Sequence, residues 1–284
     1  MNQPELLLCT DLDRTLLPNG TQPESPQARR LFSRLAMNPA ISVVYVSGRH
    51  RRLIEKAITN YKLPQPDFVI SDVGTNIYDL RGGVWRIWPQ WQKEIALDWN
   101  GYQQRQLSEI LRDISALRLQ QLSQQNTFKL SYYVALHINQ TALQQTLTDR
   151  FRELGIDASL VWSMDEPAGV GLLDILPKRA TKLHAIEFLQ SNLGVATTAT
   201  LFAGDSSNDL PVLASHIPSV LVANASPAVT REALAAAAAA GNQEYLYIAR
   251  GDYLQMNCNY SAGILEGIAH YHPELTAMFG MQAS

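Results

Sequence analysis

Two aspartates, Asp11 and Asp13, stand two positions apart just after an apolar run at residues 6–9 that reads as a buried strand. Like charges this close disfavour each other's ionisation, so one carboxyl group is biased towards holding a proton. Such a pair suits a reaction in which one carboxylate attacks a substrate and the other transfers a proton. The same spacing also fits a turn with a helix cap, a metal-dependent sugar transferase or a calcium loop. The pair alone leaves these alternatives open.

Polar motifs also follow two other apolar runs that read as strands. The stretch "SGR" at 47–49 follows residues 41–46, and "GDSSND" follows residues 200–203, while Lys182 opens a predicted helix. In an open parallel sheet, ligands bind outside the carboxyl ends of the strands, so these groups can meet at one edge. Each motif alone fits a turn, a helix start or a solvated side chain. Together and in this order, they favour a functional site.

The elements that must position these motifs follow an alternating pattern. Short apolar runs rich in β-branched residues suit strands buried on both faces of a parallel sheet. Their alternation with amphipathic stretches predicts an α/β fold with a doubly wound, mostly parallel, Rossmann-like core sheet. The expected strands cover residues 6–9, 41–46, 68–71, 200–203, 219–223 and 245–248, and the expected helices cover 26–37, 50–60, 181–193, 226–240 and 260–271.

The middle of the chain departs from this alternation. There the pattern predicts one long helix over residues 90–114 and a second over 141–154. Strands are expected in "LRLQQL", "KLSYYVALHI", "SLVWSM" and "GLLDILP". Two helices with several, mostly antiparallel strands indicate a small inserted α+β domain. The predicted organisation is a discontinuous core, residues 1–85 and 177–284, interrupted by an α+β domain at 86–176.

The composition argues against several other classes of protein. With 46% hydrophobic and 17% charged residues, the 284-residue chain is typical of a globular protein. Its formal net charge of −3 gives no overall attraction to nucleic acid or to an anionic membrane, so neither is expected as a partner. Two cysteines indicate neither a disulfide framework nor a cysteine-built zinc site. No apolar stretch approaches the ~20 residues of a membrane helix and no signal-peptide pattern is present, so we expect a cytoplasmic location.

The series "DLDRT", "SGR", a lysine opening a helix and "GDSSND" resembles the haloacid dehalogenase superfamily over both core segments. The insert is similar to the mixed α/β cap of its sugar-phosphatase branch. Two further stretches, "SDVGTNIY" at 71–78 and "FKLSYYV" at 128–134, resemble sucrose-phosphate phosphatases. The resemblance implies a Mg²⁺-dependent phosphatase that acts on a small sugar phosphate through an aspartyl-phosphate. It also implies that residues 86–176 form a cap domain for substrate recognition.

The same resemblance implies a role for each matching position. Asp11 would attack phosphorus, and Asp13 would protonate the leaving sugar oxygen and then deprotonate the attacking water. Lys182 would supply fixed positive charge, and Ser47 would hold the phosphoryl oxygens together with backbone N–H groups. The implied catalytic residues are Asp11, Asp13, Ser47 and Lys182, and the implied substrate-binding residues are Leu12, Gly48, Arg49, Gly74, Thr75, Asn76, Lys129, Ser131 and Asn208.

Mg²⁺ is the implied cofactor, because it suits one or two carboxylates together with phosphate oxygen and water. Asp205 would bind the ion beside Asp11, with a carbonyl oxygen from Asp13 as a further ligand. Asp209 and Asn208 would orient the site or the waters on the metal. The implied metal site therefore comprises Asp11, Asp13, Asp205 and Asp209.

The expected substrate is sucrose 6-phosphate, which would give sucrose and phosphate. Lys129 and Ser131 match the cap motif and could bind sugar hydroxyl groups, although the alternation of this stretch equally suits a strand with one buried face. Asn76 stands where sucrose-phosphate phosphatases often have glutamate, so mannosylfructose phosphate and mannosylglycerate phosphate stay open as substrates. A non-catalytic sugar-phosphate-binding regulatory protein is the alternative from another class. Association with the synthase that makes the substrate is a further expectation.

Overall fold

The computed structural model describes residues 4–165, 168–251 and 253–277. The chain divides into two compact units. Residues 1–87 with 182–284 form the core unit, and residues 88–181 form the inserted unit. The boundaries expected from the sequence lie a few residues before these. None of the described helices is both long and apolar enough to cross a membrane.

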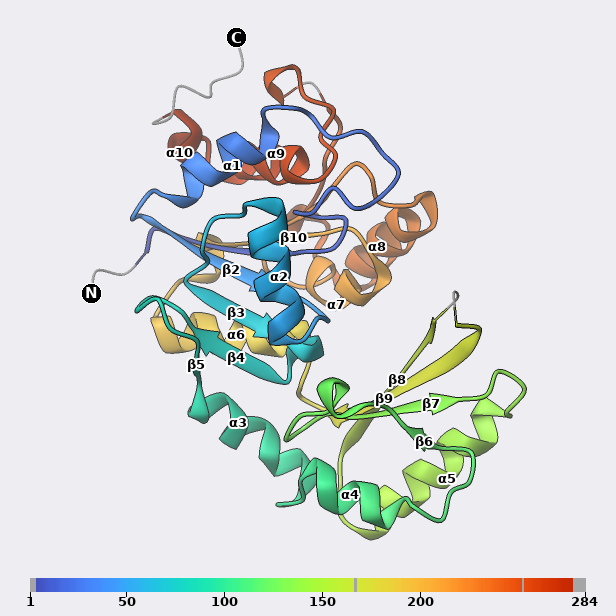
Figure 1. Ribbon diagram of the computed structural model, residues 1–284. Coiled ribbons are helices and arrows are strands. Elements are labelled where there is room, and N and C mark those ends of the chain that lie inside the picture. Colours follow the sequence, from blue (N-terminus) through green and yellow to red (C-terminus); the bar gives the residue numbers. More distant parts are fainter. Residues whose placement is uncertain (1–3, 166–167, 252, 278–284) are drawn as a thin grey trace. The chain divides into compact units, whose positions relative to one another are not determined.

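The core unit is built on an eight-stranded sheet with the order β12-β11-β10-β1-β2-β3-β4-β5 (Figure 1). The first six strands in this order are parallel, and β4 and β5 are antiparallel additions at one edge. This confirms the predicted doubly wound, mostly parallel α/β fold. The strands are β1 (Leu6–Asp11), β2 (Ile41–Val46), β3 (Phe68–Ser71), β4 (Asn76–Asp79), β5 (Arg86–Ile87), β10 (Thr200–Gly204), β11 (Ser219–Leu221) and β12 (Leu246–Ile248).

Helices cover both faces of this sheet, which is why its central strands are apolar throughout. Every residue of β1 and β2 is buried. One face packs on α1 (Ala28–Ala36), α2 (Arg51–Tyr61) and α9 (Ser261–Tyr271) in a single hydrophobic cluster. The helices that pack on the other face are α6 (Lys182–Leu193), α7 (Leu210–Leu213) and α8 (Pro227–Ala240) (Figure 1). A short helix, α10 (Pro273–Ala277), packs on α9.

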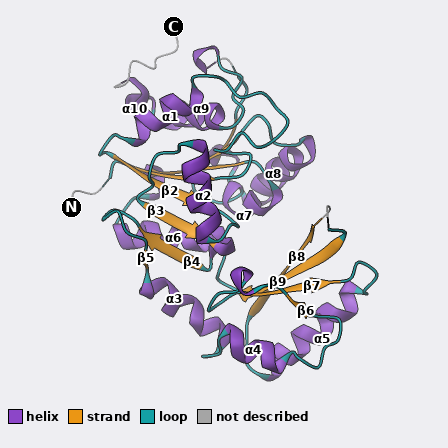
Figure 2. Ribbon diagram, in the orientation of Figure 1, coloured by secondary structure: helices purple, strands orange, loops and turns teal. Residues whose placement is uncertain are grey.

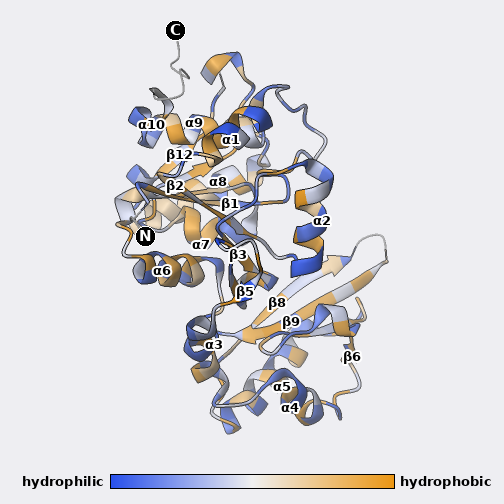
Figure 3. Ribbon diagram, turned by 60° about the vertical axis from the view of Figure 1, so that its left-hand side comes forward, coloured by the Kyte–Doolittle hydropathy of each residue, from blue (hydrophilic) through white to orange (hydrophobic). Residues whose placement is uncertain are grey.

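The helices show the pattern that such packing requires. Along α2, hydrophilic and hydrophobic residues alternate in Figure 3, and Ile54 and Ala57 are its buried positions. The alanine run of α8 ends at Gly241, whose φ of 72° places it in the left-handed region that glycine adopts most easily. The run is thus the end of a helix, as its composition predicts.

The inserted unit contains a four-stranded antiparallel sheet with the order β6-β7-β9-β8 and helices packed against it (Figure 2). Leu130, Tyr132 and Val134 alternate along β7 and are buried. The helices are α3 (Pro89–Ala96), α4 (Gln104–Ile110) and α5 (Gln140–Glu153), and the strands are β6 (Arg118–Leu119), β7 (Leu130–Val134), β8 (Ala158–Asp165) and β9 (Val170–Pro177).

Two details of this unit correct the sequence-based expectations. The helix expected over residues 90–114 is interrupted, because Asn100 and Gly101 take φ values of 48° and 83° and end the first segment. The amide of Asn100 then donates to the carbonyl of Leu154 at 3.1 Å, which fixes the turn. The strand expected in "LRLQQL" is reduced to Arg118–Leu119, since the chain turns at Leu122–Gln124.

Candidate active site

The carboxyl ends of β1 and β10 place two aspartates side by side in the core unit. These strands are parallel neighbours, with Thr10 opposite Ala203. Asp11 is the last residue of β1, and Asp205 follows β10 directly. One carboxylate oxygen from each of Asp11, Asp205 and Asp209 lies within 4.8 Å of the other two, and all three residues are buried. This is the point where the strand order reverses, the usual place for a ligand in an open α/β sheet.

Lys182 supplies the buried positive charge of this acidic cluster. It opens α6, and its Nζ donates to Asp11 Oδ1 at 2.8 Å, to Asp209 Oδ1 at 2.7 Å and to Asn208 Oδ1 at 3.0 Å. Burial by itself lowers the pKa of Lys182, but the charges of the two aspartates outweigh burial and leave the pKa raised. The ammonium group therefore stays protonated over the whole physiological range.

The crowded carboxylates have shifted proton affinities. Burial raises the pKa of Asp11 to about 7, with Lys182 opposing the rise and Asp209 adding to it. Burial and Asp209 also raise the pKa of Asp205 to about 6, against the effects of the Thr15 hydroxyl and the Arg14 guanidinium. Lys182 and the partly exposed Arg14 supply two positive charges for three clustered carboxylates, so this cluster can hold a further cation.

Asp209 is held by the loop that follows β10. Its Oδ2 accepts hydrogen bonds from the backbone N–H groups of Asp205 and Ser206, both at 3.1 Å, and from Ser206 Oγ at 3.2 Å. A Cβ atom at Gly204 would stand 2.7 Å from the Asp209 carboxylate, so only glycine permits this approach. Asp209 thereby fixes the loop that carries Asp205, besides binding Lys182.

The side chain of Asp13 lies outside the acidic cluster and pairs with Arg49. The guanidinium donates from Nε to Asp13 Oδ2 at 2.7 Å and from Nη2 to Oδ1 at 2.5 Å. Asn19 Nδ2 also donates to Asp13 Oδ1 at 2.7 Å. The side chain of Asp13 is 40% exposed, so its carboxylate is open to solvent while its position is fixed.

The segment "SGR" follows β2, the strand next to β1 on the side opposite β10. Ser47 is buried, and its Oγ accepts a hydrogen bond from the backbone N–H of Arg49 at 3.1 Å. The backbone N–H of Asp72 donates to the carbonyl of Arg49 at 3.0 Å, and that of Val73 donates to the carbonyl of Ser47 at 3.3 Å. The loops after β2 and β3 are therefore joined.

Asp72 organises the turn that contains Gly74, Thr75 and Asn76. The turn spans Asp72–Gly74 and leads from β3 into β4. Asp72 Oδ2 accepts from Ser71 Oγ at 2.8 Å and from Asn76 Nδ2 at 3.1 Å, and the carbonyl of Asp72 accepts from Thr75 Oγ1 at 3.0 Å. Gly74 takes a φ of 98°, which favours glycine at this position. Asn76 thus serves as a structural anchor of the turn.

Lys129 and Ser131 lie in the inserted unit, where both contact Asp174. The strand register places Ser131 directly opposite Asp174. Ser131 Oγ donates to Asp174 Oδ1 at 2.5 Å, and Lys129 Nζ lies 3.6 Å from Asp174 Oδ2. Both Lys129 and Ser131 are buried, so these contacts hold them in one orientation.

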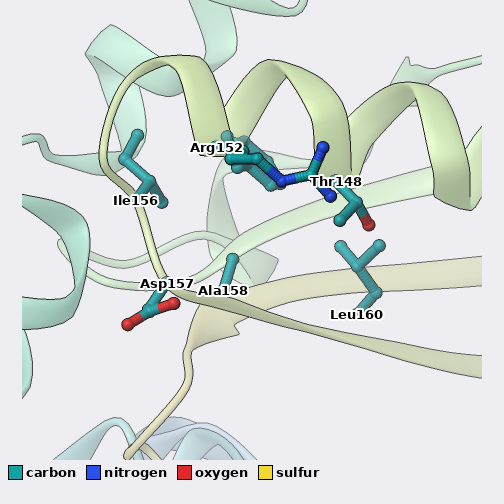
Figure 4. A pocket seen from close by; sticks show the side chains of 7 residues that line it. Thr148, Arg152, Ile156, Asp157, Ala158 and Leu160 are labelled. Carbon is teal, nitrogen blue, oxygen red and sulfur yellow. The ribbon is translucent and has the colours of Figure 1, made fainter.

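Two cavities of the structure are lined by none of the residues that the sequence implicates. One, in the inserted unit, has a volume of about 180 Å³ and lies between α5 and β8 (Figure 4). Figure 4 shows Arg152 and Thr148 on the helix above Asp157, Ala158 and Leu160. The other, in the core unit, has a volume of about 320 Å³ and is lined by residues such as Met37, Asp67 and Arg81.

Four residues that contact the predicted positions, in one unit or the other, were not expected from the sequence. Thr15 Oγ1 donates to Asp205 Oδ1 at 3.1 Å. Its position within "DLDRT" was a usable signal, because a hydroxyl four residues after a strand-end carboxylate can turn back to the same edge. Arg14, Asp72 and Asp174 carried no such signal, since their contacts depend on loops and registers that one sequence does not fix.

Comparison with known proteins identifies the family. A sequence model of the sucrose-6F-phosphate phosphohydrolase family matches residues 4–272. The chain belongs to this family. Members of the family are phosphoric monoester hydrolases, and so is this chain. The acidic cluster fits the metal ion that haloacid dehalogenase phosphatases generally use, because its donors are carboxylate oxygens.

Three known proteins are similar to this member of the sucrose-6F-phosphate phosphohydrolase family. A HAD-like hydrolase of Nitrosococcus oceani is 52% identical over 96% of this chain and 73% of its own length. The mannosylfructose-phosphate phosphatase of Agrobacterium fabrum is 26% identical over 95% of this chain and 98% of its own length. The structure of the sucrose-phosphatase from Synechocystis sp. PCC6803, solved with sucrose and phosphate, aligns with a TM-score of 0.70 and 26% identity, covering 94% of this chain and 98% of that chain.

Proposed function

We propose that this phosphatase hydrolyses sucrose 6-phosphate to sucrose and phosphate with Asp11 as its nucleophile. The observation that carries the proposal is the contact of Lys182 Nζ with Asp11 Oδ1 at 2.8 Å, in a chain that matches the sucrose-6F-phosphate phosphohydrolase family over residues 4–272. The hydrogen bond holds one carboxylate oxygen and leaves the other available to attack phosphorus. Covalent attack divides a difficult hydrolysis into two easier steps.

In the first step, an oxygen of Asp11 forms a bond to phosphorus while the bond from phosphorus to the sugar oxygen breaks. Asp13 gives a proton to the departing oxygen. In the second step, Asp13 takes a proton from a water molecule, which attacks the phosphorus and releases phosphate and the free Asp11 carboxylate. The exposure of the Asp13 side chain supports this role, because it gives the carboxyl group access to both the sugar and water.

The phosphoryl oxygens are held by groups at the ends of β1 and β2. We assign Ser47 Oγ and the backbone N–H groups near Leu12 and Gly48 to this task, with Lys182 as the fixed positive charge. Arg49 binds the substrate when its contact with Asp13 loosens. The joined loops after β2 and β3 support this assignment, because they hold Ser47 in place through the turn at Asp72.

Mg²⁺ is the proposed metal. Asp11 and Asp205 bind it directly, with the carbonyl oxygen of Asp13 as a third protein ligand, while Asp209 and Asn208 orient the site. The bound ion supplies charge neutralisation for the phosphoryl group. The four donors around Asp209, including Lys182, support its orienting role, because they occupy both of its carboxylate oxygens.

The inserted unit is proposed to recognise the sugar as a cap domain. Lys129 and Ser131 bind sugar hydroxyl groups, and Asp174 orients both of them. Gly74, Thr75 and the turn of Asn76 contribute from the core unit. The shared contact of Lys129 and Ser131 with one carboxylate supports the proposal, because a polar group that is fixed in advance binds with less loss of entropy.

Mannosylfructose phosphate is the second candidate substrate. The mannosylfructose-phosphate phosphatase and the sucrose-phosphatase of known structure are both 26% identical to this chain. Sequence identity therefore does not favour one of the two substrates over the other. The test is a comparison of kcat/KM for sucrose 6-phosphate, mannosylfructose phosphate, mannosylglycerate phosphate and fructose 6-phosphate, with Mg²⁺ and with EDTA. Phosphate release that prefers a disaccharide other than sucrose 6-phosphate refutes the sucrose assignment. Association with a synthase stays a prediction, which co-elution of the two purified proteins tests.

A further inference from the structure

Arg14 occupies an unusual backbone position beside the acidic cluster. Its φ of 59° lies in the left-handed region, which disfavours any residue with a Cβ atom. Two side chains hold it there: Asn19 Oδ1 accepts from the Arg14 N–H at 2.8 Å, and Asn224 Nδ2 donates to the Arg14 carbonyl at 2.6 Å. The chain therefore maintains an arginine where glycine would be less strained.

The side chain of Arg14 reaches Asp205. Its Nε lies 3.3 Å from Asp205 Oδ2, and its Nη2 donates to the carbonyl of Asn224 at 3.4 Å. Asp205 Oδ1 already accepts a hydrogen bond from Thr15 at 3.1 Å. Both oxygens of this buried carboxylate are thus contacted, one by a neutral hydroxyl group and one by a cation.

The two cations at the cluster have separate partners. Lys182 binds Asp11 and Asp209 and is 4% exposed, so it is fixed. Arg14 meets Asp205, and its side chain is 46% exposed, so its own charge can return to solvent, whereas the carboxylate of Asp205, which is 3% exposed, then needs another cation. Arg14 is therefore the cation of the pair that another cation can replace.

We propose that Arg14 competes with the metal ion for Asp205 and thereby weakens metal binding. The proposal rests on the proposed metal site, at which Asp205 is a direct ligand. A divalent ion bound at Oδ2 would repel the guanidinium that lies 3.3 Å from that oxygen, so binding requires Arg14 to withdraw. In the metal-free protein, Arg14 partly neutralises the three carboxylates in place of the metal.

Calorimetric titration of the EDTA-treated and dialysed protein with MgCl₂ tests the competition. Arg14→Ala and Arg14→Gly both remove the charge, so both should bind Mg²⁺ about tenfold more tightly than the wild type at low ionic strength. Arg14→Lys should stay close to the wild type. The difference should shrink in 0.5 M KCl, because Arg14 is half exposed and salt screens it. Arg81→Ala is the matched control, since this arginine pairs with Asp79 outside the cluster, and its Mg²⁺ affinity should not change.

Thermal unfolding gives a second readout that does not use activity. In EDTA, Arg14→Ala should unfold at a lower temperature than the wild type, because three carboxylates then share only Lys182. At saturating Mg²⁺ the variant should gain more stability than the wild type, as tighter binding requires. Arg14→Gly removes the same charge and also relieves the strain of the left-handed backbone at this position. Comparison of the glycine and alanine variants therefore separates the effect of charge from that of conformation. We expect the glycine variant to remain folded even if the alanine variant does not.

The outcomes separate this proposal from the metal site itself. Unchanged or weaker Mg²⁺ binding in both charge-removing variants, beside a wild type that binds, overturns the role of Arg14 and leaves the metal site standing. Binding that Asp205→Asn does not weaken, or a wild type that binds no Mg²⁺, overturns both. Tighter binding in both variants, with Arg81→Ala unchanged, supports the competition.

Discussion

Lys182 Nζ donates a hydrogen bond of 2.8 Å to Asp11 Oδ1, although 171 positions separate the two residues in the sequence. The inserted unit lies between them in the chain, so the pair forms only when both segments of the core unit have folded together. Both side chains are buried, and each is the other's charge partner. The contact therefore links the stability of the discontinuous core to its chemistry.

Replacing Lys182 by methionine should damage both stability and activity. The change leaves Asp11 and Asp209 buried without their shared cation, which costs about 3 kcal/mol of unfolding free energy. Turnover should fall by about 10³-fold, as for loss of a charge that stabilises the transition state. Urea unfolding in EDTA measures the first effect, and initial rates at a temperature where the variant is folded measure the second. Near-normal turnover in the folded variant would contradict the role of Lys182.

The stability of the metal-free protein should depend on pH in a direction opposite to that of ordinary paired carboxylates. The folded-state pKa values of Asp11 and Asp205, about 7 and about 6, lie above the ordinary value of an aspartate, 3.8. The folded state then binds protons at Asp11 and Asp205 more tightly than the unfolded state does. Protonation of these two residues therefore stabilises the folded state fully below pH 3.8, and this stabilisation is lost as the pH rises through 6 and 7. Urea unfolding in EDTA should show a lower free energy at pH 8 than at pH 5.5.

Asp11→Asn is the control for that pH dependence. An amide cannot ionise, so most of the decline between pH 5.5 and 8 should disappear in this variant. Because the amide is also a poor nucleophile, turnover and covalent phosphorylation should be lost. A decline that persists unchanged in Asp11→Asn would show that other groups cause it.

Much of the fold can be predicted from sequence because its central strands are buried on both faces. The apolar runs at 41–46 and 68–71 match β2 and β3 residue for residue. The edge strand β5 escaped notice, since its two residues are exposed and give no pattern. The interrupted helix was signalled by Asn100-Gly101, a pair typical of turns, but the amphipathic pattern on either side outweighed it.

The acidic cluster was predictable for a different reason. Strand ends place Asp11 and Asp205 by topology alone, so no side-chain detail is needed. The contacts of Asp174 and Arg14 depend instead on strand register and on a left-handed backbone position. No local pattern in a single sequence reveals the strand register or the left-handed position, so these contacts are known only from the structure.

Asp13→Asn should separate proton transfer from metal binding. The variant keeps the backbone carbonyl through which Asp13 is proposed to bind Mg²⁺, so the calorimetric Mg²⁺ affinity should change less than threefold, about 0.6 kcal/mol. Loss of the acid and base should lower kcat by about 10²- to 10⁴-fold. Arg49→Ala serves as a comparison, because it releases the Asp13 carboxylate without removing it. An unchanged kcat in Asp13→Asn would assign the proton transfer to another group.

The choice of sugar should depend on the contact of Lys129 and Ser131 with Asp174. If these groups bind the second ring, a monosaccharide phosphate leaves them without partners, and selectivity for the disaccharide can reach a factor on the order of 10⁴. We therefore expect kcat/KM for sucrose 6-phosphate to exceed that for fructose 6-phosphate and glucose 6-phosphate by a large factor. Lys129→Ala and Asp174→Asn should each reduce that factor, mainly through KM for the disaccharide, while p-nitrophenyl phosphate hydrolysis stays within about twofold. Asp165→Asn, at the far end of β8, is the control. Equal turnover of mono- and disaccharide phosphates, unaffected by Lys129→Ala, would refute the sucrose assignment and leave the phosphatase chemistry intact.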